Sequence, residues 1–227
     1  MRPAEPVSIS GKTVTVLGNG VVGVALAKGF AGLGYAVVFG TRAVDGEKTR
    51  AALAAVPGSR AAPLSEAAKA GSIAVTALPW SGLKAALLAA GPDNLAGKLV
   101  IDPSNPLDFS GAAPVLSLGY TGSAGELVQR LLPRAQVVKA FNTITAALMV
   151  HPQLPDGTPD MFIAGDDSAA KKRAAEIIKA FGWREPIDIG PISASRLLEP
   201  LAMVWISYAF RNNHWTHAFS LLGQKKS

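Results

Sequence analysis

Short apolar runs alternate with amphipathic stretches along most of this chain. Residues 12–17 and 72–78 are rich in β-branched and small apolar side chains, which is typical of strands buried on both faces of a parallel sheet. Residues 123–132 and 168–181 instead place apolar side chains at helical spacing. This alternation predicts an α/β protein with a mostly parallel sheet. We expect strands at 12–17, 35–40, 60–62, 72–78, 98–102, 136–141, 160–164 and 186–189, and helices at 21–33, 45–56, 65–70, 83–90, 123–132, 168–181 and 193–210.

The first strand runs directly into a glycine-rich turn, Gly18-Asn19-Gly20-Val21-Val22-Gly23. We expect Gly18 to allow the tight turn, Gly20 to let a pyrophosphate approach the backbone, and Gly23 to let the helix lie close to the strand. The helix would point the N–H groups of its first turn at the phosphates. Strand, turn, helix and second strand follow within about 30 residues, which predicts a dinucleotide site in a Rossmann-type, doubly wound sheet. A purely structural turn is the alternative.

The end of the second strand indicates which nicotinamide cofactor is bound. An NAD site normally has Asp or Glu there, to accept hydrogen bonds from the ribose 2′-hydroxyl. This chain has Gly40-Thr41-Arg42 instead, and a guanidinium matches a phosphate in both geometry and charge. Lys48 lies nearby in the sequence and would add a second cation. The charges favour NADP(H) over NAD(H), although either cation could simply be solvated.

Further candidate residues follow later strands, at the carboxyl edge where ligands bind in open parallel sheets. They are Leu78, Pro79 and Trp80 after 72–78, Ser104 and Asn105 after 98–102, and Lys139 and Asn142 at the end of 136–141. We expect Lys139 and Asn142 to point into the crevice. Ordinary packing is the alternative for Trp80, turn hydrogen bonding for Ser104 and Asn105, and a place at the sheet edge for Lys139.

The proline-broken residues 151–157 predict a hinge between two parts of the chain. We expect residues 1–141 to form the NADP-binding domain, and residues 142–227 to form a small C-terminal α/β lobe that completes the acceptor crevice and ends in a long helix. That helix, at 193–210, has a wide apolar face. Its members are Leu197, Leu198, Leu201, Val204, Trp205 and Tyr208. A face of this width predicts a homodimer.

Composition excludes several other functions for these 227 residues, which carry a net charge of +6 and no cysteine. The cationic residues 171–173 and 225–226 are short runs without interleaved aromatic residues, so we do not expect nucleic acid binding. His214 and His217 have no neighbouring carboxylate, which favours helix-surface or interface residues over a metal site. Residues 1–10 lack an apolar segment, and no stretch reaches about 18 apolar residues. We therefore expect no membrane association and a cytoplasmic location.

These motifs together resemble a known family. The glycine turn, Gly40-Thr41-Arg42, Leu78-Pro79-Trp80, residues 102–106 and residues 138–143 look like those of the NADPH-dependent reductases related to the archaeal coenzyme F420:NADP oxidoreductase. The reductase domain of the STEAP metalloreductases is similar, and pyrroline-5-carboxylate reductase is a more distant relative. Where the deazaflavin enzymes tend to carry His, this chain has Asn142, as the metalloreductase domains do.

The resemblance implies an acceptor ring stacked against the nicotinamide of NADP(H). Residues that it places around the cofactor are Gly18, Asn19, Gly20, Val21, Val22 and Gly23 at the pyrophosphate, Thr41, Arg42 and Lys48 at the 2′-phosphate, and Leu78, Pro79, Ala140, Asn142 and Thr143 beside the nicotinamide. Trp80 and Asn105 complete the candidates that we assign to cofactor binding.

The predicted chemistry is hydride transfer between NADPH and a deazaflavin (F420) or flavin-like acceptor. No Tyr-x-x-x-Lys pair is present to deliver a proton to a carbonyl, and we assign no catalytic residue. Transfer between two ring cofactors needs mainly alignment and exclusion of water. The alternatives are an imine reductase of the pyrroline-carboxylate type and a non-enzymatic NADPH-binding redox sensor.

Overall fold

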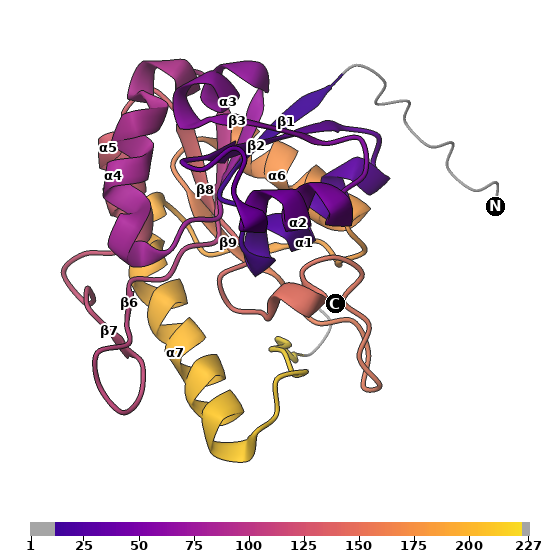
Figure 1. Ribbon diagram of the computed structural model, residues 1–227. Coiled ribbons are helices and arrows are strands. Elements are labelled where there is room, and N and C mark those ends of the chain that lie inside the picture. Colours follow the sequence, from indigo (N-terminus) through magenta and orange to yellow (C-terminus); the bar gives the residue numbers. More distant parts are fainter. Residues whose placement is uncertain (1–11, 224–227) are drawn as a thin grey trace.

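An eight-stranded sheet forms the centre of the protein in the computed structural model, which describes residues 12–223 (Figure 1). The predictions made for residues 1–10 and 225–226 lie outside the described residues. The strand order is β10-β9-β8-β5-β4-β1-β2-β3. The strands are β1 (Thr13–Leu17), β2 (Ala36–Thr41), β3 (Arg60–Pro63), β4 (Ile73–Thr76), β5 (Leu99–Asp102), β8 (Gln136–Lys139), β9 (Phe162–Gly165) and β10 (Ile187–Asp188). A separate antiparallel hairpin joins β6 (Leu107–Asp108) to β7 (Val115–Leu116).

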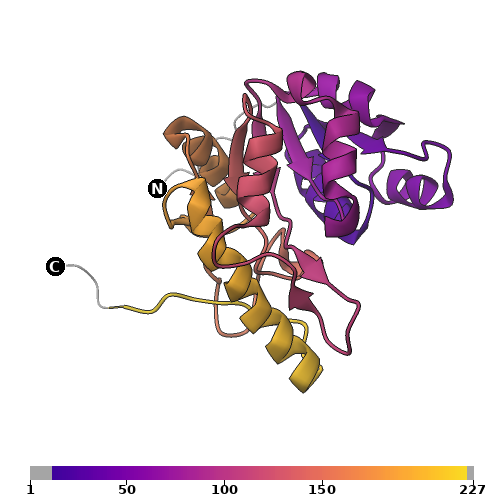
Figure 2. The ribbon, with the colours of Figure 1, turned by 90° about the vertical axis from the view of Figure 1, so that its left-hand side faces the viewer.

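Helices cover both faces of this sheet (Figures 1 and 2). They are α1 (Val21–Gly32), α2 (Glu47–Ala55), α3 (Leu64–Ala70), α4 (Trp80–Ala90), α5 (Ala124–Leu131), α6 (Ser168–Ala180) and α7 (Ser195–Asn212), with short 3-10 turns η1 (Pro92–Leu95), η2 (Ala146–Leu148) and η3 (Ile192–Ala194). The buried side chains of α1, α2 and α6 form one core, and those of α3, α4 and α5 form a second core. Helix α7 extends beyond the sheet (Figure 2).

The two cores explain why the strands are apolar on both sides. Successive side chains of a strand point to opposite faces. In β1, Val14 and Val16 therefore belong to the core under α1 and α6, whereas Leu17 belongs to the core under α3 and α4. Thr15, on the second face, is fully buried and donates its hydroxyl to the Ala67 carbonyl of α3 over 2.6 Å.

The strand order reverses between β1 and β4, which are parallel neighbours. Six strands in the order β3-β2-β1-β4-β5-β8 are all parallel, and this is the arrangement of a doubly wound Rossmann sheet. β9 pairs antiparallel with β8, and β10 is parallel to β9. The predicted fold class, a mostly parallel Rossmann-type sheet with a long C-terminal helix, is confirmed. Because β9 and β10 extend the same sheet, the division at residues 141 and 142 stays a prediction.

Most predicted elements are present, with small differences at their ends. Helix α4 begins at Trp80, earlier than the predicted residue 83, because Pro79 at its N-cap position supplies a suitable extended backbone. The β6–β7 hairpin was not predicted, since each of its strands has only two residues. Among residues 12–223, no helix combines the length and apolar character that crossing a bilayer requires.

The chain turns back along α7 after the left-handed residue Asn213 (Figure 1). The ring of His217 stacks on that of Trp205, with centroids 4.4 Å apart, and the His217 carbonyl accepts a 2.8 Å hydrogen bond from Trp205 Nε1. Further on, the Leu221 N–H donates to Asp160. His214 and His217 thus lie in the segment that follows the helix.

Candidate functional site

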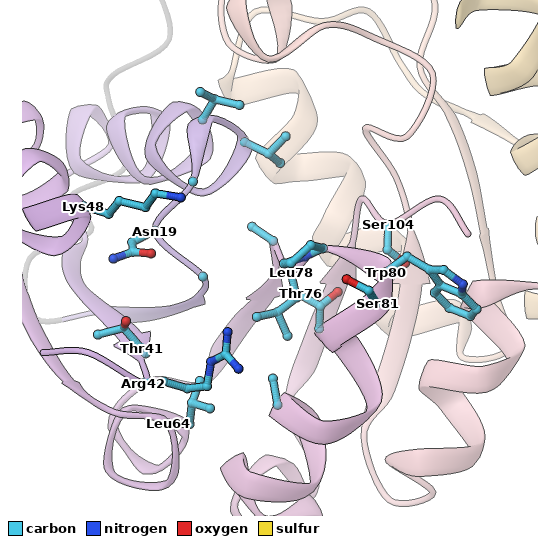
Figure 3. Close-up of a pocket in the computed structure, with 18 of the residues that line it drawn as sticks. Asn19, Thr41, Arg42, Lys48, Leu64, Thr76, Leu78, Trp80, Ser81 and Ser104 are labelled. Carbon is cyan, nitrogen blue, oxygen red and sulfur yellow. The ribbon is translucent and has the colours of Figure 1, made fainter. Parts of the chain in front are cut away.

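A cavity of about 820 Å³ opens at the carboxyl ends of β1, β2, β4 and β5 (Figure 3). This is the edge at which ligands bind in doubly wound sheets, and the volume is within the range of small-molecule sites. Its wall comes from the turn after β1, the start of α2, the start of α4 and the turn after β5. The cavity therefore lies at the predicted crevice.

The glycines of the turn after β1 experience different surroundings. Gly18 has φ +104°, and a Cβ there would lie 2.1 Å from the Ala77 carbonyl oxygen. A Cβ on Gly23 would lie 2.3 Å from the Gly18 oxygen. These two glycines are required by the fold itself. Gly20 is not, because its φ is −79° and a Cβ would meet nothing within 4 Å.

Gly20 is the N-cap residue of α1, and no side chain caps this helix end. The first helical backbone bond runs from Val24 N–H to the Gly20 carbonyl. The first-turn N–H groups before Val24 therefore have no partner within the helix. Val21 and Val22 line the cavity. An uncapped helix end of this kind attracts an anion.

Positive charge gathers at one end of the cavity (Figure 3). Arg42 and Lys48 are exposed, line the cavity and make no ion pair or side-chain hydrogen bond within residues 12–223. Nearby, Asn19 Nδ2 donates to Thr49 Oγ1 over 2.7 Å, and Thr49 Oγ1 donates to the Ala43 carbonyl over 2.6 Å. These bonds tie the glycine turn to the start of α2, so that the segment bearing both cations is fixed.

Leu78, Trp80 and Ser104 line the other end of the cavity (Figure 3). Their chain neighbours Pro79 and Asn105 line the cavity as well. The Asn105 amide donates to the Asn142 carbonyl over 2.8 Å. The Asn142 amide donates in turn to Asn105 Oδ1 over 3.0 Å and to the Leu198 carbonyl over 2.9 Å. This pair of amides joins the turn after β5 to the turn after β8.

The expectation that Lys139 points into the crevice is wrong. Its side chain is fully buried in β8, and its Nζ lies 2.7 Å from Asp102 Oδ2 and 3.0 Å from Glu199 Oε1. Glu199 of α7 also accepts hydrogen bonds from the backbone N–H groups of Ala124 and Gly125 at the start of α5. Burial acts to lower the pKa of the Lys139 amine, but the two carboxylates outweigh it and raise that pKa. Lys139 is therefore a buried cation that joins β5, β8 and α7.

The structure brings most of the predicted site residues together around the cavity. Those that line it are Gly18, Asn19, Gly20, Val21, Val22, Thr41, Arg42, Lys48, Leu78, Pro79, Trp80 and Asn105. The predicted residues outside the lining are Gly23, Ala140, Asn142 and Thr143, and all four are buried. Their assignment to cofactor binding stays a prediction.

Sequence analysis missed Thr49 and Thr76, which also line the cavity. Thr76 ends β4 and donates to Asp102 Oδ1 over 2.6 Å. The rule that ligands gather at strand carboxyl ends would have found Thr76, whereas Thr49 lies inside a helix and gives no such signal. In the described part of the chain, no three histidine, aspartate or glutamate side chains form a metal-binding group.

Comparisons with known proteins agree with this geometry. The family model described as "NADP oxidoreductase coenzyme F420-dependent" matches residues 13–106. Metalloreductase STEAP3 of Rattus norvegicus is 36% identical over 112 residues, which cover 49% of this chain and 21% of that protein. The F420-dependent NADP reductase of Methanocaldococcus jannaschii is 28% identical over 143 residues, or 62% of this chain and 63% of that protein. The chain therefore spans less than two thirds of either of these relatives.

A solved structure covers nearly the whole chain. It is that of a protein from Arthrobacter sp. FB24 described as a candidate F420-dependent NADP reductase. The two share 37% sequence identity and superpose with a TM-score of 0.89, over 94% of this chain and 100% of that one.

Proposed function

Because this chain belongs to the F420-dependent NADP oxidoreductase family of enzymes, we propose that it transfers hydride between NADP(H) in the cavity and a deazaflavin or flavin-like acceptor. The observation that carries the proposal is the open position beside Gly20. Neither the backbone conformation nor any neighbour requires a glycine there, so the empty space serves a ligand that approaches the backbone closely.

The pyrophosphate of the cofactor would bind at the uncapped amino end of α1. The unpaired N–H groups of the first turn donate to phosphate oxygens, and the positive end of the helix dipole favours the negative charge. Asn19 completes this wall, and its bond to Thr49 holds it in place.

The 2′-phosphate would bind between Thr41, Arg42 and Lys48. The Thr41 hydroxyl accepts a hydrogen bond from the Ala43 N–H and keeps its own proton to donate. Arg42 can donate in a bidentate fashion, and Lys48 adds a point charge. No carboxylate takes the place at the end of β2 where an NAD site holds one, since Arg42 follows Thr41 directly.

The nicotinamide and the acceptor would meet at the end lined by Leu78, Pro79, Trp80 and Asn105, beside the segment of Ala140, Asn142 and Thr143. NADPH, when bound, supplies the hydride. The work of the chain is to align two rings and to keep water out, and Leu78 and Trp80 give this wall its apolar character. The deazaflavin is favoured as acceptor because two relatives carry F420 in their description.

We also propose that two copies of the chain associate through α7. Leu197, Val204 and Tyr208 are 65%, 59% and 47% exposed, and their spacing of seven and four residues puts them on one helix face. A helix that extends from the body with an apolar face is suited to packing against a second subunit (Figure 2).

The test is NADPH oxidation in the presence of F420, of free flavins and of pyrroline-5-carboxylate, followed at the nicotinamide absorbance band. Oxidation that depends on F420 or a flavin is expected, and NADH should be a poor substitute. Turnover with pyrroline-5-carboxylate alone would identify an imine reductase instead. Tight NADPH binding with no acceptor turned over would identify a redox sensor.

A further inference from the structure

Ser104 lies in the turn after β5, at the end of the cavity away from Arg42 (Figure 3). The residue is only 6% exposed, and yet it lines the cavity. Its Oγ has no hydrogen-bond partner among residues 12–223. A buried hydroxyl without a partner loses its hydrogen bonds to water and gains none in exchange, which costs free energy. Such groups are therefore uncommon in native proteins. The hydroxyl of Ser104 therefore calls for a partner outside the chain.

The backbone of Ser104 is held at both of its polar atoms. Its N–H donates to Asp102 Oδ1 over 3.2 Å, and its carbonyl accepts from Lys139 Nζ over 2.6 Å. Asp102 and Lys139 are both fully buried and lie 2.7 Å apart as an ion pair. Buried charged groups thus hold the backbone of Ser104 in place at the edge of the cavity.

The neighbouring polar groups make their hydrogen bonds to one another and not to this hydroxyl. The three protons of the Lys139 amine are taken by Asp102, Glu199 and the Ser104 carbonyl. Both protons of the Asn142 amide are taken by Asn105 Oδ1 and the Leu198 carbonyl. These hydrogen bonds pair the backbone groups of the turn but leave Ser104 Oγ without a partner.

We propose that the Ser104 hydroxyl donates a hydrogen bond to a carbonyl oxygen at the redox end of the bound ligands, and that Lys139 is the residue that positions it. This inference rests on the proposed function. The oxygen belongs either to the nicotinamide carboxamide or to a ring carbonyl of the deazaflavin or flavin acceptor. Both oxygens present the same chemistry to the hydroxyl, and binding measurements separate them.

The experiment compares Ser104→Ala with the wild-type chain by calorimetry. Each is titrated with NADP⁺ and with adenosine 2′,5′-bisphosphate, which has the 2′-phosphate but no nicotinamide. The KM for F420 or a flavin is measured in parallel. Ser110→Ala is the matched control, because Ser110 is an exposed serine of the same connection that does not line the cavity.

A weaker affinity for NADP⁺ by about 3- to 10-fold, with the affinity for the bisphosphate unchanged, assigns the bond to the carboxamide. An unchanged affinity for NADP⁺ with a KM for the acceptor raised by a similar factor assigns it to the acceptor. The inference is overturned if the Ser104→Ala variant matches the wild type in both affinities and in the KM. It is also overturned if the variant loses equal affinity for NADP⁺ and for the bisphosphate. If the wild type binds neither nucleotide, the proposed function itself fails.

Lys139→Met tests the positioning role. We expect it to reproduce the selective loss of Ser104→Ala, and the double variant should be no worse than Lys139→Met alone. Lys171→Met, which removes the more exposed ion pair with Asp188, should bind both nucleotides normally. If the losses of affinity in Lys139→Met and Ser104→Ala add up in the double variant, the positioning role is overturned. Where Lys139→Met does not fold, the Ser104→Ala result still decides the binding role.

Discussion

Gly20 differs from the other glycines of its turn, because nothing in the described structure requires it to lack a side chain. We expect Gly20→Ala to fold with a loss of about 1 kcal/mol, since alanine is a poorer N-cap residue than glycine. Its Cβ would stand where the pyrophosphate approaches, so affinity for NADP⁺ should fall at least about tenfold. Urea unfolding and calorimetry on the same preparation measure the two effects.

The neighbouring glycines provide the comparison. Gly23→Ala should lose stability as well as affinity, because its Cβ would lie 2.3 Å from the Gly18 oxygen. Gly32→Ala, whose Cβ would meet nothing within 4 Å, should leave binding unchanged. Normal binding of NADP⁺ by Gly20→Ala would remove the main support for the pyrophosphate site.

Arg42 is the residue whose charge should decide between the two nicotinamide cofactors. We expect Arg42→Ala to weaken NADPH binding by about 1.5–3 kcal/mol, the usual size of a hydrogen bond to a charged group. NADH lacks the 2′-phosphate, so its affinity should change little. Parallel titrations with the two cofactors give the answer.

A suitable control is Arg50→Ala, because Arg50 is an exposed arginine of α2 outside the cavity lining, bonded to the Asp45 carbonyl. It should bind NADPH as the wild type does. An equal loss for NADPH and NADH in Arg42→Ala would contradict the 2′-phosphate assignment.

Removing the positive charge of Lys139 should strongly destabilise the protein. We expect Lys139→Met to lower the free energy of unfolding by about 3–5 kcal/mol, because Asp102 and Glu199 would remain buried without a counter-charge. Lys179→Met removes an exposed ion pair with Glu185 and should cost no more than about 1 kcal/mol. Urea unfolding measures both losses of stability. If they are similar, the buried ion pairs stabilise the protein no more than the exposed one does.

At the scale of elements, the segment after α7 depends on the neutral form of His217. Its Nδ1 donates to the His214 carbonyl, while its Nε2 is buried without a partner within residues 12–223. Burial lowers the pKa of His217 below the ordinary 6.5, and this effect outweighs the hydrogen bond to the His214 carbonyl, which raises that pKa. The folded protein is stabilised by this neutral histidine when the pH is above the pKa that His217 has in the unfolded chain. That stabilisation is lost as the pH falls through the lower pKa of the folded state.

We therefore expect this segment to loosen from α7 as the pH falls below the ordinary value of 6.5. Fluorescence of Trp205 and Trp215 should report it, because both rings lie in this aromatic cluster. His217→Phe keeps an aromatic ring on Trp205 and removes the titrating group, so its signal should be flat over the same range. If the wild type and His217→Phe show the same pH response, the response does not come from His217.

The elements that were predicted are those whose signal is local. A strand, a glycine turn and a helix in order, as in residues 12–33, need only neighbouring residues to specify them. The cluster around Lys139 was missed because Glu199 lies 60 residues further along the chain (199 − 139), and no pattern in the sequence links the two. A lysine in an apolar strand was therefore assigned to the crevice, although its partners are buried carboxylates of β5 and α7.

At the scale of the whole molecule, the exposed face of α7 should govern association. We expect Val204→Glu to shift the protein from dimer to monomer, because it would place a charge in the centre of an apolar contact. Leu88→Glu is the control, since Leu88 of α4 is 51% exposed and belongs to neither the cavity nor α7. Sedimentation velocity distinguishes the species, and a wild-type chain that sediments as a monomer would rule out the proposal.

The reversal of direction between β8 and β9 gives the sheet a polarity. Helix α6 follows β9, so its amino end emerges at the rim opposite to that of α1. Asp167 already caps that end, with its carboxylate 2.7 Å from the Ala170 nitrogen, and would repel an incoming phosphate. The reversed strands therefore do not repeat the phosphate-binding helix end of α1, and we expect the protein to saturate at one dinucleotide per polypeptide.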